Sequence, residues 1–450
     1  MEIRVKSGEK LSVKQSLFYG FQSVLACNLF LGPIVLIGIF QMNVQQSAAF
    51  IGMTFLACGI ATLIQSGFFL KMQVIQGVSF AALGAIVAVV MGGGWQTLVG
   101  AVIVSSIFII LLGALRIFSK FVRIFIPGLI AGTVIIVVGI SLIPVTFSSV
   151  VNLPGNANVN FFLAGITFVL LLIFMRLGHM KNRFAKILSI GGIIYAIVIG
   201  TVIASFFGQV NLEPVKEAAW FALPKVLPYG APKFDIASII VFCVIMIVVM
   251  IESVGTWFTL TELSGEKVDE KRMDRGVVGE GIGVLIGSFF GGLPITSYAS
   301  NTGVLVLTKV FSRYAAFGAG VIAVVMAFCP KLLYLIAVVP SSVIWGVYGI
   351  VAISVFMSGI TSIKKYPSTE RNNLIVGISV MMTIGVGLLP AAMVGAMPGV
   401  LSYFFQAPIA IGSITAIILN LVLRARPEDQ APEPEKVTEV QPEEVVQAAV

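Results

Sequence analysis

The chain of 450 residues is 58% hydrophobic and only 11% charged, with a mean hydropathy of +1.05. Soluble domains carry about 25% charged residues, so this composition excludes an ordinary soluble globular protein. Apolar runs of roughly 18 residues recur from Ser16 to Leu423, which is typical of a polytopic helical membrane protein. The formal net charge of +8 comes from bases beside these runs and gives no indication of nucleic-acid binding.

Fourteen apolar segments, two of them short, predict an all-α polytopic membrane protein with 14 transmembrane segments. If the N-terminus is cytoplasmic, 23 Lys and Arg residues fall in inside segments and four fall outside, as the positive-inside rule requires. We therefore expect a multi-pass protein of the cytoplasmic (plasma) membrane with both termini in the cytoplasm. The expected spans are 16–40, 47–66, 74–91, 96–114, 126–145, 160–175, 185–208, 236–259, 276–292, 298–308, 314–329, 339–360, 373–390 and 407–423.

The spans divide into two halves of seven. The third span of each half contains a polar, interrupted stretch, at Gln73–Phe80 and at Pro294–Asn301. Interruptions at matching positions predict inverted repeats that meet at a substrate site near the membrane midplane. The expected domains are a cytoplasmic N-terminal segment (1–15), the first seven-span repeat (16–234), the second (235–424) and a disordered acidic cytoplasmic tail (425–450).

Two acids, Glu252 and Glu280, fall within predicted spans. An ionisable residue at membrane depth is costly and indicates function. Glu252 and Thr256 lie four residues apart on one helix face, where the carboxylate could accept hydrogen bonds from a substrate and load or release a proton. A structural acid bonded to a neighbouring helix is the alternative for Glu252. Glu280, close to a basic loop, is either a proton relay or a polar clamp between the halves.

The residues that a metal site, an ATP-driven transporter or a hydrolase needs are absent from the sequence. One His and four scattered Cys do not supply the usual metal ligands, so no metal site is expected. A phosphate-binding glycine loop followed by Lys and Ser or Thr is absent, as is a Ser/His/Asp arrangement. We therefore expect neither a cofactor nor an enzyme.

The run Asn301-Thr-Gly-Val-Leu-Val-Leu-Thr308-Lys309 resembles the signature of the nucleobase–ascorbate transporter family, the nucleobase–cation symporters that include uracil and xanthine permeases. That signature is Asn-x-Gly, four residues, Thr, then a basic residue and Gly; here Val310 replaces the final Gly. The resemblance extends, in order, over Gly20–Ala26, Gly77–Phe80, Glu252–Gly255 and Phe289–Tyr298.

The resemblance implies seven-plus-seven inverted repeats arranged as core and gate domains, with short strands before the third and tenth spans. Substrate would bind between the two strands, near the N-termini of the half-helices. By position, proton coupling is assigned to Glu252 and Glu280. Substrate binding is assigned to Glu252, Phe80, Thr256, Tyr298, Ala299, Ser300 and Asn301.

Two positions depart from the family. Most members have Gln or Glu, which contacts the base, where this chain has Ser300, and Gln-His where it has Gln22-Ser23. The shorter Ser300 leaves space for a bulkier oxidised purine such as xanthine or urate, or for a water.

The resemblance thus implies a secondary active transporter that imports nucleobases, purines such as xanthine or urate in particular, by symport with protons rather than sodium. Its expected partners are the nucleobase, the proton and the lipid bilayer, and a homodimer stays open because members of the family often form dimers. The alternatives are a uracil-type pyrimidine permease, an anion transporter of the sulfate-permease architecture, and a channel or passive facilitator.

Overall fold

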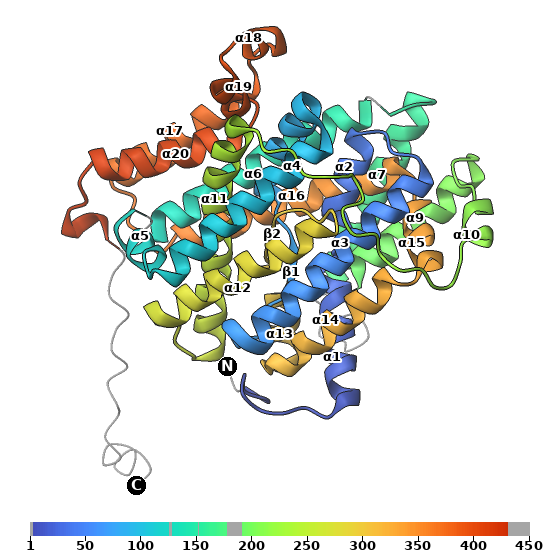
Figure 1. Ribbon diagram of the computed structural model, residues 1–450, viewed down its shortest axis with the longest axis horizontal. Helices are drawn as coiled ribbons and strands as arrows, with labels where there is room; N and C mark the ends of the chain where they lie inside the picture. Colours follow the sequence, from blue (N-terminus) through green and yellow to red (C-terminus); the bar gives the residue numbers. More distant parts are fainter. Residues whose placement is uncertain (1–2, 126–127, 152, 178–190, 431–450) are drawn as a thin grey trace.

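The computed structural model describes residues 3–125, 128–151, 153–177 and 191–430, and this part of the chain is mainly helical (Figure 1). Among the described residues, six helices are long and apolar enough to cross a membrane, or up to eight if each of two bent helix pairs is one span. A polytopic helical fold is therefore present. The number of fourteen spans stays a prediction, because the other helices are short or broken.

The elements follow the chain in this order: α1 (Val13–Cys27), α2 (Leu31–Ile39), α3 (Val44–Ile64), a π-helical turn (Gln65–Phe69), β1 (Gln76–Val78), a 3₁₀ turn (Phe80–Ala82), α4 (Leu83–Ala114), α5 (Phe118–Phe125), α6 (Gly128–Val151), α7 (Ala157–Leu177), α9 (Gly192–Phe206), α10 (Glu213–Glu217), α11 (Ile236–Ser264), α12 (Glu270–Phe289), β2 (Ile295–Ser297), α13 (Asn301–Thr308), α14 (Arg313–Ala327), α15 (Pro330–Ala337), α16 (Ser341–Ile363), α17 (Glu370–Gly387), α18 (Ala391–Gly395), α19 (Gly399–Phe405), α20 (Pro408–Val422) and a 3₁₀ turn (Pro427–Asp429).

Several boundaries differ from the predicted spans for local backbone reasons. The expected span 16–40 is two helices, because Asn28 adopts a left-handed conformation (φ 50°, ψ 53°) that ends α1. Residues 83–91 of the expected span 74–91 and the whole expected span 96–114 lie in one helix, α4, in which Gly94 has a non-helical backbone (φ 78°, ψ 174°). Residues 74–82 instead contain β1 and the 3₁₀ turn. The helix α15, before α16, was not expected from the sequence. Most of the predicted acidic tail lies outside the described residues.

The helices pack in two groups. In the first helix group (α1, α3, α4, α11, α12, α14 and α15), α3 packs against α12, α14 and α15, and α4 packs against α11 and α12. In the second helix group (α6, α7, α9, α16, α17 and α20), α16 packs against α6, α7 and α9, while α17 and α20 pack against each other and against α6. Each group combines helices from both halves of the sequence. The two groups meet where α11 contacts α6 and α20, and α2, which packs against α3, also contacts α16.

The two short strands that the family resemblance implied are present within the polar stretches, one before α4 and one before α13. They form an antiparallel pair with Gln76 opposite Ser297 and Val78 opposite Ile295. In Figure 1 the pair lies in the middle of the molecule, surrounded by helices. All six strand residues are buried, so the backbone pairing satisfies polar groups that no water reaches.

Candidate functional site

A cavity of about 650 Å³ lies between the two helix groups, beside the strand pair. Glu252, on α11, is half-buried and lines this cavity. On one side the cavity wall includes Phe80, Ala299, Ser300 and Thr302; on the other it includes residues of α6, α7, α9 and α16. At one end it reaches the exposed ion pair of Glu262, in the last turn of α11, and Lys365, which follows α16. The acid predicted from sequence therefore borders a space large enough for a small molecule.

The Glu252 carboxylate is oriented by the segment that follows β1. Ser79 donates a hydrogen bond from Oγ to Glu252 Oε2 at 2.8 Å. The backbone N of Ser79 in turn donates to Pro294 O at 2.9 Å, just before β2. The carboxylate is thus positioned by both interrupted stretches, and it stays able to accept further hydrogen bonds from the cavity.

Aromatic rings frame the cavity next to Glu252. Phe80 and Tyr298 stack with ring centroids 6.1 Å apart and an interplanar angle of 15°. Tyr298 donates from its hydroxyl to Val78 O at 2.8 Å, which fixes this ring across the strand pair. A Cβ on Gly77 would lie 2.3 Å from Cζ of Tyr298, so the ring can occupy this place only above a glycine.

The remaining predicted substrate residues take different places. Ala299 and Ser300 line the cavity. Thr256 also lines it, and its hydroxyl donates to Ser297 O at 3.0 Å. Asn301 is buried, and it is not among the described residues that line the cavity; its Nδ2 donates to Gln73 O at 3.1 Å and joins the two interrupted stretches.

Glu280 lies behind the strand pair. It is fully buried on α12 and is not among the described residues that line the cavity. Its carboxylate accepts hydrogen bonds from Ser253, from Gln65 Nε2 at 3.1 Å and from Gln76 Nε2 at 3.5 Å. The Ser253 hydroxyl also contacts Thr296 Oγ1 at 2.8 Å. Glu280 therefore links α11, α12 and both strands, and Ser253 is the chain neighbour of Glu252.

Sequence reasoning did not single out Ser79, Gln65 or Ser253, although each is a polar residue within or beside an apolar run. It also missed Cys27 and Asn28 at the end of α1, which line the same cavity. Among the described residues, no three His, Cys, Asp or Glu side chains are grouped so that they could hold a metal ion.

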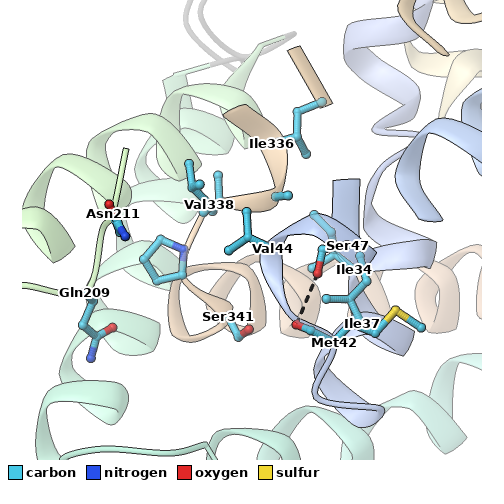
Figure 2. Close-up of a pocket in the computed structure, with 13 residues that line it drawn as sticks. Ile34, Ile37, Met42, Val44, Ser47, Gln209, Asn211, Ile336, Val338 and Ser341 are labelled. Carbon is cyan, nitrogen blue, oxygen red and sulfur yellow. Dashed lines mark hydrogen bonds between the residues drawn. The ribbon is translucent and has the colours of Figure 1, made fainter. Parts of the chain in front are cut away.

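A second, smaller cavity of about 260 Å³ lies at the other end of α16, next to Ser341 (Figure 2). Its wall combines Val44 and Ser47 of α3 with Gln209 and Asn211, which follow α9. Figure 2 shows the Ser47 hydroxyl pointing to Met42 O, the acceptor of its 3.3 Å hydrogen bond. The two helix groups thus enclose one cavity near each end of α16.

This arrangement, a buried strand pair that positions a carboxylate at a cavity between two helix groups, is that of a membrane permease. Residues 14–392 match a family model described as the Permease family, and the chain belongs to this family. It is 30% identical to the xanthine permease of Bacillus subtilis, covering 91% of this chain and 93% of the relative. It is 28% identical to the uric acid permease PucK of the same organism, covering 94% of this chain and 99% of the relative.

Among solved structures, the chain is similar to the transmembrane domain of a cyanobacterium bicarbonate transporter, BicA. The TM-score is 0.63 with 17% sequence identity, over 85% of this chain and 98% of that domain. At this identity the likeness shows a shared fold and carries no information on the substrate.

Proposed function

We propose that this protein is a secondary active transporter that imports nucleobases across the cytoplasmic membrane by proton symport, with purines such as xanthine or urate as its substrates. The observation that carries the proposal is the Glu252 carboxylate, which lies at the cavity between the two helix groups beside the ring of Phe80. A carboxylate accepts hydrogen bonds from the N–H groups of a flat heterocycle, and an aromatic ring stacks on its face. The names of the xanthine and uric acid permeases that it resembles favour a purine.

The proposed substrate-binding residues are Glu252, Phe80, Thr256, Tyr298, Ala299 and Ser300 at the cavity wall. Asn301 contributes by holding Gln73, because its amide joins the two interrupted stretches. Glu252 and Glu280 are proposed to couple transport to the proton. Geometry supports this coupling. Ser253, which follows Glu252 in the chain, donates a hydrogen bond to Glu280 and contacts Thr296 of β2, so a movement of the strand pair would affect both carboxylates.

The finer architecture is also a proposal. The first helix group would be the core domain and the second the gate domain, formed by two inverted repeats that meet near residue 235, with 14 spans and cytoplasmic termini. The mixed origin of each group supports the repeats, and the bias of basic residues supports the orientation. The cavity at Glu252 then opens to the cytoplasm, since Glu262 and Lys365 lie at its mouth. The same proposal includes assembly of two copies of the chain into a homodimer.

Uptake of radiolabelled xanthine, urate, uracil and guanine, with and without an uncoupler, tests the function. We expect accumulation of a purine that the uncoupler abolishes. Glu252→Gln should abolish coupled uptake, while Glu262→Gln, a change of the same kind on the same helix at the cavity mouth, should leave it nearly intact. Near-normal coupled transport by Glu252→Gln would remove Glu252 from the site. Accumulation that the uncoupler does not affect would indicate another coupling ion, and equilibration without accumulation would indicate a facilitator.

The role of Glu280 is tested by Glu280→Gln, which keeps the shape of the side chain. If Glu280 couples the proton, the variant still binds substrate and exchanges it, but it no longer accumulates it against a gradient. Normal accumulation would leave Glu280 as a polar clamp of the strand pair.

The alternatives make different predictions for the same panel. A uracil-type permease would take up uracil in preference to the purines, and an anion transporter would take up none of the bases. Neither alternative is favoured, because the chain belongs to the Permease family over residues 14–392 and matches xanthine and uric acid permeases over nearly its whole length.

Ser300→Gln tests the position that departs from the family; an unchanged competition profile would exclude Ser300 as a determinant of selectivity.

A further inference from the structure

Asn28 lies where α1 ends, and its geometry leaves one polar atom without a partner. Its backbone adopts the left-handed conformation, and its Nδ2 donates a hydrogen bond to Ala26 O at 2.8 Å. Because a carbonyl oxygen only accepts, this bond fixes which end of the amide is nitrogen and which is oxygen. The other end, Oδ1, is buried and has no hydrogen-bond partner among the described residues.

An unpartnered buried amide oxygen is costly, and such groups call for an explanation. Asn28 is only 4% exposed and belongs to the wall of the cavity that Glu252 lines. A ligand in that cavity with an N–H group would satisfy the free oxygen. The free acceptor thus points to a donor that arrives with the substrate.

The position of Asn28 relative to Ser300 suggests which contact it makes. Its neighbour Cys27 interacts with the Ser300 side chain, so the end of α1 adjoins the start of α13 at the cavity. The Ser300 hydroxyl is too short to replace the longer amide or carboxyl group that the family pattern has at this position.

We propose that Asn28 determines specificity by accepting a hydrogen bond from a ring N–H of the substrate through its Oδ1. This inference rests on the proposed function and deepens it. Glu252 and Asn28 then offer two acceptors from two helices of the same site. Two acceptors select planar heterocycles with several ring N–H groups, as in xanthine and urate, over bases such as adenine whose ring nitrogens are mostly lone-pair acceptors.

Asn28→Gly is the sharpest test, because glycine adopts the left-handed conformation without strain and only the amide is lost. We would measure inhibition of radiolabelled xanthine uptake by xanthine and by xanthines methylated singly at each ring nitrogen. The wild type should reject at least one methylated isomer by more than about 10-fold, as expected for a lost hydrogen bond to a buried group. Asn28→Gly should bind xanthine about 10-fold more weakly and no longer reject that isomer, while rejection of the isomer that faces Glu252 persists.

Gln41→Gly is the matched control, since it removes an amide side chain at another position of positive φ (49°), on the surface. It should leave the whole profile unchanged. In a variant that carries both Asn28→Gly and Ser300→Gln, the longer amide of the new glutamine supplies the missing acceptor. Part of the affinity for xanthine that Asn28→Gly loses should therefore return. Membrane levels of each variant would be compared by immunoblot.

The proposal is overturned if Asn28→Gly is present in the membrane and selects among the methylated xanthines as the wild type does. Should Asn28→Gly not reach the membrane, Asn28→Ala removes the same amide and leaves a neutral side chain; unchanged discrimination among the methylated xanthines in that variant would overturn the proposal as well. If the wild type takes up no nucleobase, the proposed function itself fails. If the wild type transports a base and Asn28→Gly behaves normally, only the role of Asn28 fails.

Discussion

At Glu252, one hydroxyl connects the carboxylate to the rest of the fold. Ser79 Oγ donates to the carboxylate at 2.8 Å, and Ser79 itself is fixed by its backbone bond to Pro294 O at 2.9 Å. Hydrogen bonds to an ionised acceptor are about twice as strong as neutral ones. Ser79 is therefore a positioning residue, which acts on the substrate through Glu252.

We predict that Ser79→Ala weakens substrate binding with little effect on the amount of folded protein. The carboxylate loses its orienting donor, and a net contribution of about 1.5 kcal/mol corresponds to roughly a 10-fold rise in KM. Uptake kinetics in intact cells would measure it. Ser66→Ala is the control, since Ser66 is equally buried and bonds to Thr62 O within its own helical segment. A KM unchanged by Ser79→Ala would show that the hydroxyl does not orient Glu252.

Among the elements, the helix α11 carries Glu252, and its first turn is fixed by a side-chain cap. Asp235 accepts hydrogen bonds from the Ser238 hydroxyl at 2.6 Å and from the Ser238 backbone N at 2.8 Å. The Ser238 side-chain bond, followed by the backbone bond, lowers the pKa of Asp235 below its ordinary value of 3.8. A lowered pKa means that the cap contributes stability above that value and loses it as the pH falls below it.

Asp235→Ala should therefore lower the free energy of unfolding by about 1 kcal/mol at neutral pH, and Asp235→Asn by much less, because Asn also caps helices. Thermal unfolding of the purified protein in detergent would measure both. The difference between wild type and Asp235→Ala should shrink below pH 3.8. Glu217→Ala, on the exposed helix α10, serves as the control. Equal stability of wild type and Asp235→Ala at neutral pH would contradict the capping role.

The strand pair depends on one close approach. A Cβ at residue 77 would lie 2.3 Å from Tyr298 Cζ, so the ring or the strand has to move. We predict that Gly77→Ala abolishes most uptake and lowers thermal stability, because the Phe80–Tyr298 stack and the Tyr298–Val78 bond are displaced together. Gly377→Ala, with nothing within 4 Å of the added atom, should leave both properties unchanged or raise stability slightly. If Gly77→Ala takes up substrate as the wild type does, the Tyr298 ring can move aside without loss of function, and the prediction is wrong.

For the whole molecule, the two cavities lie toward opposite ends of α16, so labelling at each of them tests the direction of access. The larger one contains Glu252, and the smaller one is separated from it by the packed interior between the helix groups. Thr361 lies in the wall of the larger cavity near its mouth, and Ser341 lies in the wall of the smaller. If α11 and α16 end on the cytoplasmic side, these two positions face opposite compartments.

In a background with the four native cysteines replaced by alanine, a membrane-impermeant thiol reagent should label Thr361→Cys from the cytoplasmic side and Ser341→Cys from the outside. Added xanthine should slow labelling of Thr361→Cys, because substrate occupies the same cavity. Labelling from the reversed sides would overturn the proposed orientation. Labelling of Thr361→Cys at the same rate with and without substrate would speak against the cavity as the substrate path.

The class of protein follows from the sequence alone, because recurrent apolar runs of roughly 18 residues have few stable solutions outside a bilayer. It also located Glu252 and the two interrupted stretches, since a charge or an irregular backbone at membrane depth has to be explained by function. The strands at Gln76–Val78 and Ile295–Ser297, which the family resemblance implied, lie within these two stretches.

What these residues contact depends on the tertiary structure. The sequence reasoning did not single out Ser79 or Asn28, and it located Asn301 only through the family signature. The bonding partners of Ser79 and Asn301 lie 173 and 228 residues away, and Asn28 Oδ1 has no hydrogen-bond partner among the described residues. Contacts at such separation depend on how the two helix groups pack, and no local pattern encodes that packing. The same packing places Glu252 at the cavity and Glu280 behind the strand pair, although both acids fall within predicted spans.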